Sequence, residues 1–307
     1  MDLMYLHWLE SLRTPFLTDF FISVTALGTG AFYQTALLVI YWCISKRAGT
    51  LLLAAHALGA VVMYVWKALA AIPRPYLLDP TLTPLHHEKT FSFPSGHSFN
   101  ASSVWGGIGW LQGRAGKMLS AVIFFMVMLL IMLSRNYIGV HTPQDVIVGM
   151  LLGLGAVIAC QRLLAWGESS ERSRLMVDLL LVLSAVGFVF FAFVYCATDG
   201  SMDKVIVKSY LSTQKGAINI LGHILGLVIG MELERRFIRF STDVSLKYKL
   251  IRVIPGLFLS TLLYKLPLPF LAKQPAVFLR MFIFTVFVTA VYPALWKCWE
   301  PKGIDSK

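Results

Sequence analysis

The chain has 307 residues, of which 57% are hydrophobic and 14% are charged, and its mean hydropathy is +0.70. Soluble domains carry roughly 25% charged residues, and a soluble fold of this size cannot hide so much apolar surface from water. The formal net charge is +11, but no basic patch is visible on a soluble stretch, so no nucleic-acid partner is expected. The composition excludes an ordinary soluble domain and favours an all-α, polytopic membrane helix bundle.

The first stretch, residues 1–15, has apolar residues at loose helical spacing and reaches a proline at Pro15. It lacks the basic region and the apolar run of a cleavable signal peptide, so none is expected. We predict a short interfacial helix over residues 1–15 that ends at the proline.

Nine later segments approach the roughly 20 mostly apolar residues that a membrane-spanning helix needs. A polar, turn-rich stretch at 198–215 separates the last three from the first six. The sequence therefore predicts nine spans. They lie near residues 20–44, 50–72, 98–113, 118–134, 144–166, 175–197, 216–233, 251–271 and 276–296.

Nine spans place alternate loops on opposite sides of the membrane, and one set of loops holds most of the basic residues. The positive-inside rule places that set in the cytoplasm. The C-terminus is then inside, and the opposite loops face the periplasm or an organelle lumen. The basic-rich set comprises Lys46, Arg47, Arg114, Lys117, Arg162, Arg172, Arg174, Arg235, Arg236, Arg239, Lys247, Lys249, Arg252, Lys297, Lys302 and Lys307.

The first of three polar clusters closes the second span. Lys67 lies near the end of that span, and Arg74 follows the helix break at Pro73. A cation this close to lipid is costly, so it usually faces a partner or a cavity. Snorkelling of Lys67 to the interface is the alternative.

The second cluster is the stretch FSFPSGHSFN, residues 91–100, which opens the third span. Gly96 lets the backbone approach a ligand closely, and free amides at a helix start attract anions. Ser95 adds a hydroxyl donor and His97 a titratable proton. The alternative is an ordinary helix cap followed by an interfacial histidine.

The third cluster, SRNYIGVHTPQD, joins the fourth and fifth spans. Ser134 and Arg135 close one span, and His141 and Asp145 open the next. Residues four apart can meet on one helical face, and an aspartate beside an imidazole fixes its tautomer. The alternative is a plain helix start, with Asp145 near the positive end of the helix dipole.

Span parity puts all three clusters on the same membrane face. Three fixed cations and an open helix start suit a dianion with several oxygens, since arginine matches phosphate as a fork and lysine as a point charge. His141, oriented by Asp145, is then a candidate nucleophile, and His97 can protonate a leaving oxygen. The residues describe phosphoryl transfer through a phosphohistidine, with positioning and electrostatics supplying most of the acceleration.

These stretches resemble the three signatures of the type-2 phosphatidic acid phosphatase superfamily. Lys-x6-Arg-Pro corresponds to 67–75, Pro-Ser-Gly-His to 94–97, and Ser-Arg-x5-His-x3-Asp to 134–145. The resemblance covers roughly residues 15–170. It implies a six-helix core, placed at 16–197, and metal-independent dephosphorylation through a covalent phosphohistidine. Residues 198–307 would then hold additional C-terminal transmembrane helices and a cytoplasmic tail.

Carried over residue by residue, the resemblance makes His141 the nucleophile, Asp145 its partner and His97 the general acid. It also implies a set of phosphate-binding residues. These are Lys67, Arg74, Ser95, Gly96, Ser134 and Arg135.

The superfamily includes phosphatases of lipids, polyprenyl diphosphates, sphingoid bases and sugars. A membrane-embedded site favours a phosphorylated lipid as substrate, with membrane lipids as the other partner. A soluble sugar phosphate is the alternative substrate, and a phosphate-binding carrier is an alternative of another class. No cofactor is expected. His86, His87 and Glu88 could be read as metal ligands, but adjacent histidines usually point apart and no further ligand has a supporting spacing, so no metal is expected.

Overall fold

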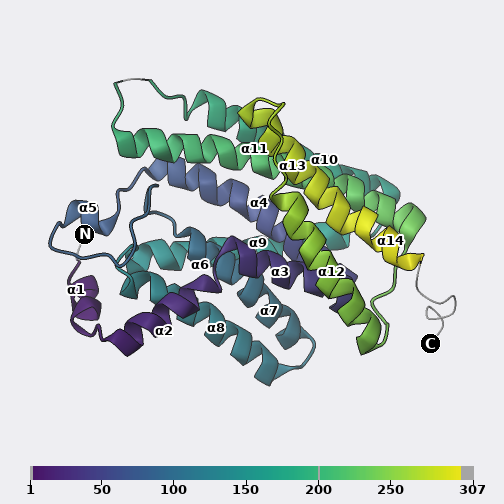
Figure 1. Cartoon of the computed structure of the whole chain (residues 1–307), viewed down its shortest axis with the longest axis horizontal. Coiled ribbons are helices and arrows are strands. Elements are labelled where there is room, and N and C mark those ends of the chain that lie inside the picture. The colour runs from purple at the N-terminus through teal and green to yellow at the C-terminus, as the bar shows by residue number, and fades with distance from the viewer. Residues whose placement is uncertain (1–2, 200, 299–307) are drawn as a thin grey trace.

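The computed structural model describes residues 3–199 and 201–298, and this part of the chain contains helices and no strand. The all-α fold expected from the composition is confirmed. Figure 1 shows long helices running side by side, with α1 at one end of the bundle and α14 at the other. The predicted cytoplasmic tail, including Lys302 and Lys307, lies outside the described residues.

The N-terminal helix is shorter than predicted. Helix α1 (Met4–Ser11) ends four residues before Pro15, and the proline opens helix α2 (Pro15–Ala26) instead of ending α1. The reason is local, because a proline is well tolerated in the first turn of a helix and the Thr14 side chain accepts a hydrogen bond from the amide of Leu17, which caps α2.

The core helices follow in chain order and include two π-helical segments, and the C-terminal extension includes two more. The core comprises α3 (Gly30–Val39), η1 (Ile40–Ile44), α4 (Lys46–Ala70), α5 (Pro75–Leu78), α6 (Gly96–Ala101), η2 (Ser102–Gly106), α7 (Gly107–Arg114), α8 (Met118–Tyr137), α9 (Pro143–Gly167) and α10 (Glu171–Val194). The C-terminal extension comprises α11 (Lys204–Leu233), η3 (Glu234–Ile238), α12 (Leu246–Tyr264), α13 (Lys273–Val286), η4 (Phe287–Val291) and α14 (Tyr292–Lys297).

The sequence predicts nine membrane spans, and this number is too high. Fewer helices are long enough and apolar enough to cross a membrane. Six helices of the described residues qualify, or seven when the bent pair Pro15–Ala26 and Gly30–Ile44, which meet at 50°, counts as one span. The six are Lys46–Leu78, Met118–Tyr137, Pro143–Gly167, Glu171–Val194, Lys204–Ile238 and Lys273–Lys297. The predicted segments 98–113 and 251–271 are helical but do not qualify.

The segment 98–113 is too polar to qualify as a membrane-spanning helix, and its position in the bundle explains why. It belongs to the continuous helical run α6–η2–α7, which packs against α4, α8 and α9 in the centre of the core. Ser98, Ser102 and Ser103 on this run are fully buried among protein atoms. A helix enclosed by other helices can carry serine and glycine, since its neighbours rather than lipid meet its side chains.

The segment 251–271 fails for a different reason. Helix α12 starts at Leu246 and ends at Tyr264, so it takes in Lys247, Lys249 and Arg252. The buried Arg252 donates hydrogen bonds to the carbonyl oxygens of Trp42 and Ser241. The charged first half of α12 is therefore hydrogen-bonded to the core. Its three basic residues lower the apolar content of the helix below that of a membrane span.

Four helix ends lie together at the end of the bundle that carries α1 and α5 (Figure 1). They are the C-terminal ends of α4 and α8 and the N-terminal ends of α6 and α9. Gly149 of α9 makes this approach close, because a Cβ there would lie 2.6 Å from the carbonyl oxygen of Ser95. The three polar clusters of the sequence belong to these four ends.

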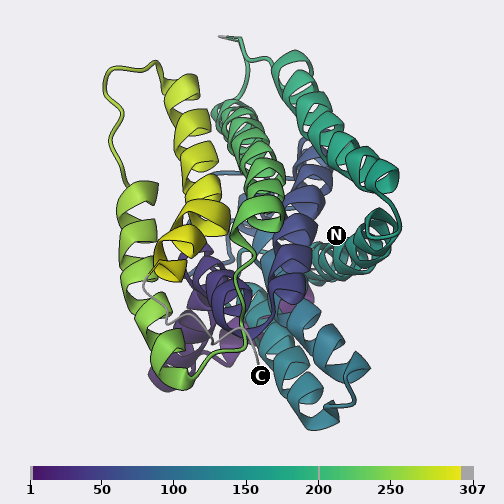
Figure 2. The same ribbon diagram turned by 90° about the vertical axis from the view of Figure 1, so that its right-hand side faces the viewer.

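The extension packs on the core through α11, which lies between α4 and α13. Figure 2, turned by 90°, shows the extension as a group of helices along one side of the core. Gly222, Gly226 and Gly230 recur every four residues on α11 and face α13, where a Cβ at Gly226 would lie 2.8 Å from Cβ of Thr285. Small residues at this spacing let two helices approach closely in a membrane.

We expect Gly226→Ala to lower the thermal unfolding midpoint of the detergent-solubilised protein by several degrees. The new methyl group would meet both Thr285 and the carbonyl oxygen of Phe282, and overpacking costs about 1–3 kcal/mol. Gly187→Ala on α10 is the matched control, because nothing lies within 4 Å of its Cβ and the change gains up to about 1 kcal/mol of helix propensity. Equal midpoints for the two variants would contradict the close packing of α11 on α13.

Candidate active site

His141 and Asp145 meet at the N-terminus of α9, as their spacing predicts. Thr142 caps the helix in a capping box with Asp145, whose Oδ2 accepts a hydrogen bond of 2.8 Å from the Thr142 amide. His141 Nδ1 lies 3.3 Å from the same oxygen. The carboxylate thus does both things that the sequence left open: it caps the helix and it orients the imidazole.

Arg74 contacts the other side of the imidazole. Its Nη1 lies 2.8 Å from Nε2 of His141. A guanidinium can only donate, so Nε2 accepts, and the ring proton resides on Nδ1, toward Asp145. This tautomer directs the lone pair of Nε2 at the cationic side of the site.

The pKa of His141, which lies between two spans, is lowered well below its ordinary value. Burial is the largest cause, and the cationic groups of Arg74, Arg135 and Lys67 add to it. A lowered pKa keeps the imidazole neutral near pH 7. A neutral imidazole retains the lone pair that a nucleophile requires.

Two of the three cations are held by backbone carbonyl groups, most of them on the loop before α6. Arg74 donates to the carbonyl oxygens of Thr90 and Val140 at 2.7 and 3.1 Å. Lys67 Nζ donates to those of Phe91 and Ser92 at 2.9 and 3.2 Å. Lys67 therefore does not snorkel to the interface: it is 7% exposed and Arg74 is 3% exposed.

The third cation, Arg135, is paired with Glu88. Its Nη2 lies 2.8 Å from Oε1 of Glu88, and its Nη1 donates to Oγ1 of Thr25 at 2.9 Å. Burial raises the pKa of Glu88, but Arg135 and Arg74 outweigh it and hold the pKa below its usual value. The Nε of Arg135 is buried and has no acceptor among the described residues. An orphaned charged donor is costly, and a phosphate oxygen would satisfy it.

The start of α6 contributes backbone amides. The amide of Ser95 donates to the carbonyl oxygen of Asp145 at 2.9 Å, and its hydroxyl oxygen accepts from the amide of Ser98. The amides of Gly96 and His97 have no acceptor among the described residues, and a Cβ at Gly96 would meet nothing within 4 Å. Two free amides beside open space are the arrangement that an anion fits.

Ser134 is at the same helix end, but its side chain does not face the others. Its hydroxyl donates to the carbonyl oxygen of Ile131 at 2.6 Å, within its own helix. Its expected part in phosphate binding stays a prediction. The remaining predicted residues lie at this end of the bundle, and the contacts above join most of them into one cluster.

Two residues of the cluster were missed by the sequence analysis. Ser92 donates to Oδ2 of Asp145 at 2.5 Å and lies 3.4 Å from Nδ1 of His141. Glu88 was considered only as a metal ligand, and the structure shows it as the counter-ion of Arg135 instead. Both lie on the loop between α5 and α6, where no periodic pattern marks a functional side chain.

Within the described ranges, 3–199 and 201–298, no group of three or more histidine, cysteine or acidic side chains is arranged to hold a metal ion. His87, the neighbour of Glu88, lies edge-on against the Tyr76 ring, with centroids 5.2 Å apart. Metal independence stays a prediction, because an arrangement of ligands says nothing about the rate of reaction.

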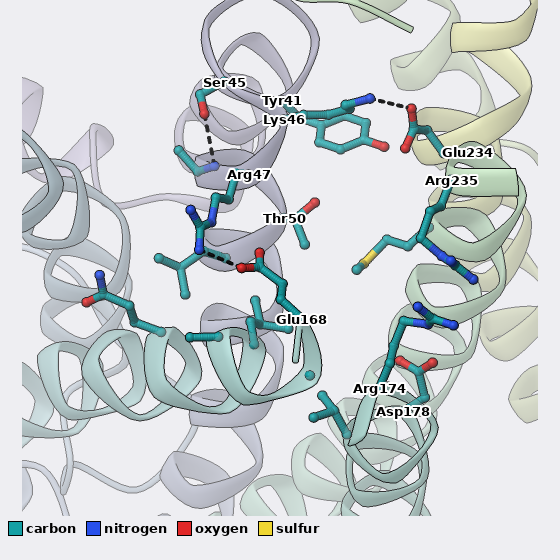
Figure 3. A pocket seen from close by; sticks show the side chains of 18 of the residues that line it. Tyr41, Ser45, Lys46, Arg47, Thr50, Glu168, Arg174, Asp178, Glu234 and Arg235 are labelled. Atoms are coloured by element: carbon teal, nitrogen blue, oxygen red, sulfur yellow. Dashed lines mark hydrogen bonds and ion pairs between the residues drawn. The ribbon is translucent and has the colours of Figure 1, made fainter. Parts of the chain in front are cut away.

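A separate cavity of about 880 Å³ lies toward the other end of α4, beside Lys46 and Arg47. Figure 3 shows its charged lining, in which Lys46 points to Glu234 and Arg47 to Glu168, at 2.7 and 2.6 Å. These ion pairs connect α4 to the extension and to the end of α9. Lys46 and Arg47 are thus paired with acidic side chains, and among the described residues of this lining no buried cationic donor is left without an acceptor as the Nε of Arg135 is.

The fold and the site together define a multi-pass membrane protein with a buried, cation-rich cluster built around a histidine. A family model described as the PAP2 superfamily matches residues 48–168, and one described as a PAP2 superfamily phosphatase transmembrane extension matches 218–300. The chain belongs to the PAP2 superfamily. The three signatures of the sequence fall within the first of these matches.

Two relatives and one solved structure illustrate the family. Phosphatidylglycerophosphatase B of Bacillus subtilis is 31% identical over 153 residues, covering 47% of this chain and 73% of that protein. Dihydrosphingosine 1-phosphate phosphatase of Schizosaccharomyces pombe is 27% identical over 280 residues, covering 81% and 66%. A crystal structure of a PAP2-type phosphatidylglycerolphosphate phosphatase from Bacillus subtilis matches 52% of this chain and 82% of its own, with a TM-score of 0.46 and 27% identity. These relatives are phosphatases of lipid phosphates.

We expect Ser92→Ala to lower kcat for phosphate release about tenfold to a hundredfold while KM changes little. The variant removes a hydrogen bond to a buried carboxylate, and such bonds contribute about 1.5–3 kcal/mol. The Asp145 carboxylate would then hold the imidazole of His141 less firmly. The measurement is steady-state kinetics with a phosphorylated lipid in detergent.

Ser92→Thr keeps the hydroxyl and should restore most of kcat, whereas Ser23→Ala, on the exposed hydroxyl of α2, is the control away from the site. A rise in KM with unchanged kcat would show that Ser92 binds substrate rather than positions Asp145.

Proposed function

We propose that the protein is an integral membrane phosphatase that hydrolyses a lipid phosphate monoester or diphosphate through a phosphohistidine on His141. The substrate classes are phosphatidates, sphingoid-base phosphates and polyprenyl diphosphates. One observation carries the proposal: Nε2 of His141 accepts from Arg74 at 2.8 Å while Nδ1 faces Asp145 at 3.3 Å. The imidazole is thus presented as a neutral nucleophile to the place where the cations would bind a phosphate.

The first step transfers the phosphoryl group to the protein. The phosphate oxygens take up donors of Arg74, Arg135 and Lys67, and the Arg74 contact to Nε2 is exchanged for one to phosphate. Nε2 of His141 then forms a bond to phosphorus as the ester P–O bond breaks. His97, which takes up a proton when the anionic phosphate binds beside it, donates that proton to the leaving oxygen, and the lipid alcohol departs. Asp145 stabilises the cationic imidazole that results.

The second step returns the enzyme to its starting state. His97, now neutral, takes a proton from a water molecule as that water attacks phosphorus. The P–N bond breaks, its electron pair returns to Nε2 as the lone pair, and inorganic phosphate leaves. The charge that develops on the equatorial oxygens is met by fixed cations in a buried site, where electrostatic stabilisation is strongest.

The active site is proposed to face away from the cytoplasm. The cluster lies at one end of the helices, and the helix ends opposite to it carry many basic residues. These include Lys46, Arg47, Arg114, Lys117, Arg172, Arg174, Arg235, Arg236 and Arg239. The positive-inside rule puts such an end in the cytoplasm, so the cluster would open to the periplasm or to a lumen.

Brief incubation with ³²P-labelled substrate should label the protein with phosphate that is lost in acid and retained in alkali, as expected of a P–N bond. His141→Asn should carry no label and release no phosphate, because the amide cannot attack phosphorus. The labelling should proceed equally in excess EDTA. Phosphate release by His141→Asn at the wild-type rate, or activity that EDTA removes and Mg²⁺ restores, would contradict the proposed chemistry.

A panel of substrates should show higher kcat/KM for long-chain lipid phosphates than for glucose 6-phosphate by at least tenfold. The relatives act on lipids, and a site at the ends of spanning helices lets a hydrocarbon tail stay out of water. Equal or greater kcat/KM for the sugar phosphate would favour a soluble substrate. The measurement is inorganic phosphate release by the purified protein in detergent.

A further inference from the structure

A second cavity begins at the active site and runs between the core and the extension. It has a volume of about 310 Å³, and Gly96 and His97 form part of its wall. The other walls come from α3, α4, α11, α12 and α13. The candidate general acid thus borders a space that the phosphate chemistry itself does not require.

The cavity is elongated along α4. Its lining residues on that helix run from Tyr64, one turn before Lys67, to Leu53. Eleven residues of α-helix span about 16 Å. Two alanines on this stripe, Ala57 and Ala60, leave the width that larger side chains would fill.

Helix α11 forms the facing wall and runs antiparallel to α4. A Cβ at Gly216 would lie 2.9 Å from the Tyr64 ring near the active site, while Glu234, just after α11, pairs with Lys46 at the far end. The far part of the cavity is lined by apolar side chains of both core and extension, including Leu37, Phe284 and Val288. His56 and His223 line this part as well, and each is hydrogen-bonded within the protein, to Ser103 and Thr285 respectively.

Three amide side chains also line the cavity. Asn100 donates to the carbonyl oxygen of Gly28 at 3.3 Å, and the other two have no hydrogen-bond partner among the described residues. They are Gln34 of α3 and Asn219 of α11, both partly buried. Asn219 lies one turn beyond Gly216 and so within about 5 Å, along the helix axis, of the level of Tyr64. Unpaired amides in a mostly apolar cavity favour a ligand that brings hydroxyl or amino groups to them.

We infer that this cavity receives the single hydrocarbon chain of the substrate, which carries a hydroxyl or amino group close to its phosphate. The inference rests on the proposed function and narrows its substrate class to single-chain phosphate lipids. Ligand cavities range over about 300–1,000 Å³, and a volume of about 310 Å³ suits one hydrocarbon chain better than the paired chains of a diacyl lipid. The C-terminal extension then selects the substrate, because α11, α12 and α13 supply one side of the cavity.

The test compares kcat/KM for hexadecyl phosphate with that for butyl phosphate, in wild type and in variants that fill the cavity. Ala60→Phe and Ala57→Leu should each lower the long-to-short ratio of kcat/KM at least tenfold. Ala159→Leu, on the exposed face of α9, should leave the ratio unchanged. Using a ratio within one variant removes the effect of any loss of folded protein.

A second comparison tests whether Asn219 contacts a polar group close to the phosphate of the substrate. Wild type should turn over a 2-amino-1,3-diol phosphate of the same chain length with at least fivefold higher kcat/KM than hexadecyl phosphate. Asn219→Leu should remove that preference while hexadecyl phosphate is still hydrolysed. An equal preference in wild type and Asn219→Leu would overturn the assignment of Asn219.

Failure of the inference and failure of the proposed function give different results. If wild type hydrolyses neither alkyl phosphate nor any other lipid phosphate, the proposed function is wrong. If wild type hydrolyses them but the cavity-filling variants keep the wild-type ratio, the chain lies elsewhere and the inference is overturned. A wild-type preference for a diacyl phosphatidate over hexadecyl phosphate would overturn it as well.

Discussion

The structure depends on one imidazole held from both sides, with Asp145 at Nδ1 of His141 and Arg74 at Nε2. Each contact alone is common, but together they fix the tautomer, the ring orientation and the neutral state. The Asp145 contact is local to the start of α9, whereas the Arg74 contact forms only because the segment after α4 meets that start. The close approach of α9 to the start of α6 at Gly149 brings the free amides of Gly96 and His97 to the same end of the bundle.

The buried cations impose the second constraint. An isolated charge in a protein interior is costly unless it is paired or hydrogen-bonded. Backbone carbonyl groups satisfy Lys67 and Arg74, and Glu88 pairs with Arg135. The loop between α5 and α6 supplies most of these partners, so it holds the cations in place before any phosphate arrives. The cluster is preorganised, which is the condition for strong electrostatic stabilisation of a transition state.

The clustering of most candidate residues could be predicted from the sequence, because they stand at fixed spacings on helix ends and such spacings can be read without knowing how the helices pack. Ser92 and Glu88 could not, because their roles come from contacts across 53 and 47 residues of chain. The hydrophobic pattern predicted the helix bundle correctly but predicted too many spans. One reason is that the central run α6–η2–α7 contacts protein rather than lipid. The cavity between core and extension could not be predicted at all, because it is formed by Ala57 and Ala60 facing helices whose packing partners no local pattern identifies.

The central claim is that Nε2 of His141 attacks phosphorus. Vanadate adopts the trigonal bipyramidal geometry of a phosphoryl group in transfer, so a crystal or cryo-EM structure of the protein with vanadate tests the claim most directly. The account predicts vanadium bonded to Nε2 of His141, with Arg74 and Arg135 on its equatorial oxygens and His97 facing the apical oxygen opposite the histidine. Vanadate bound away from His141, with the Arg74–His141 contact still intact, would contradict it.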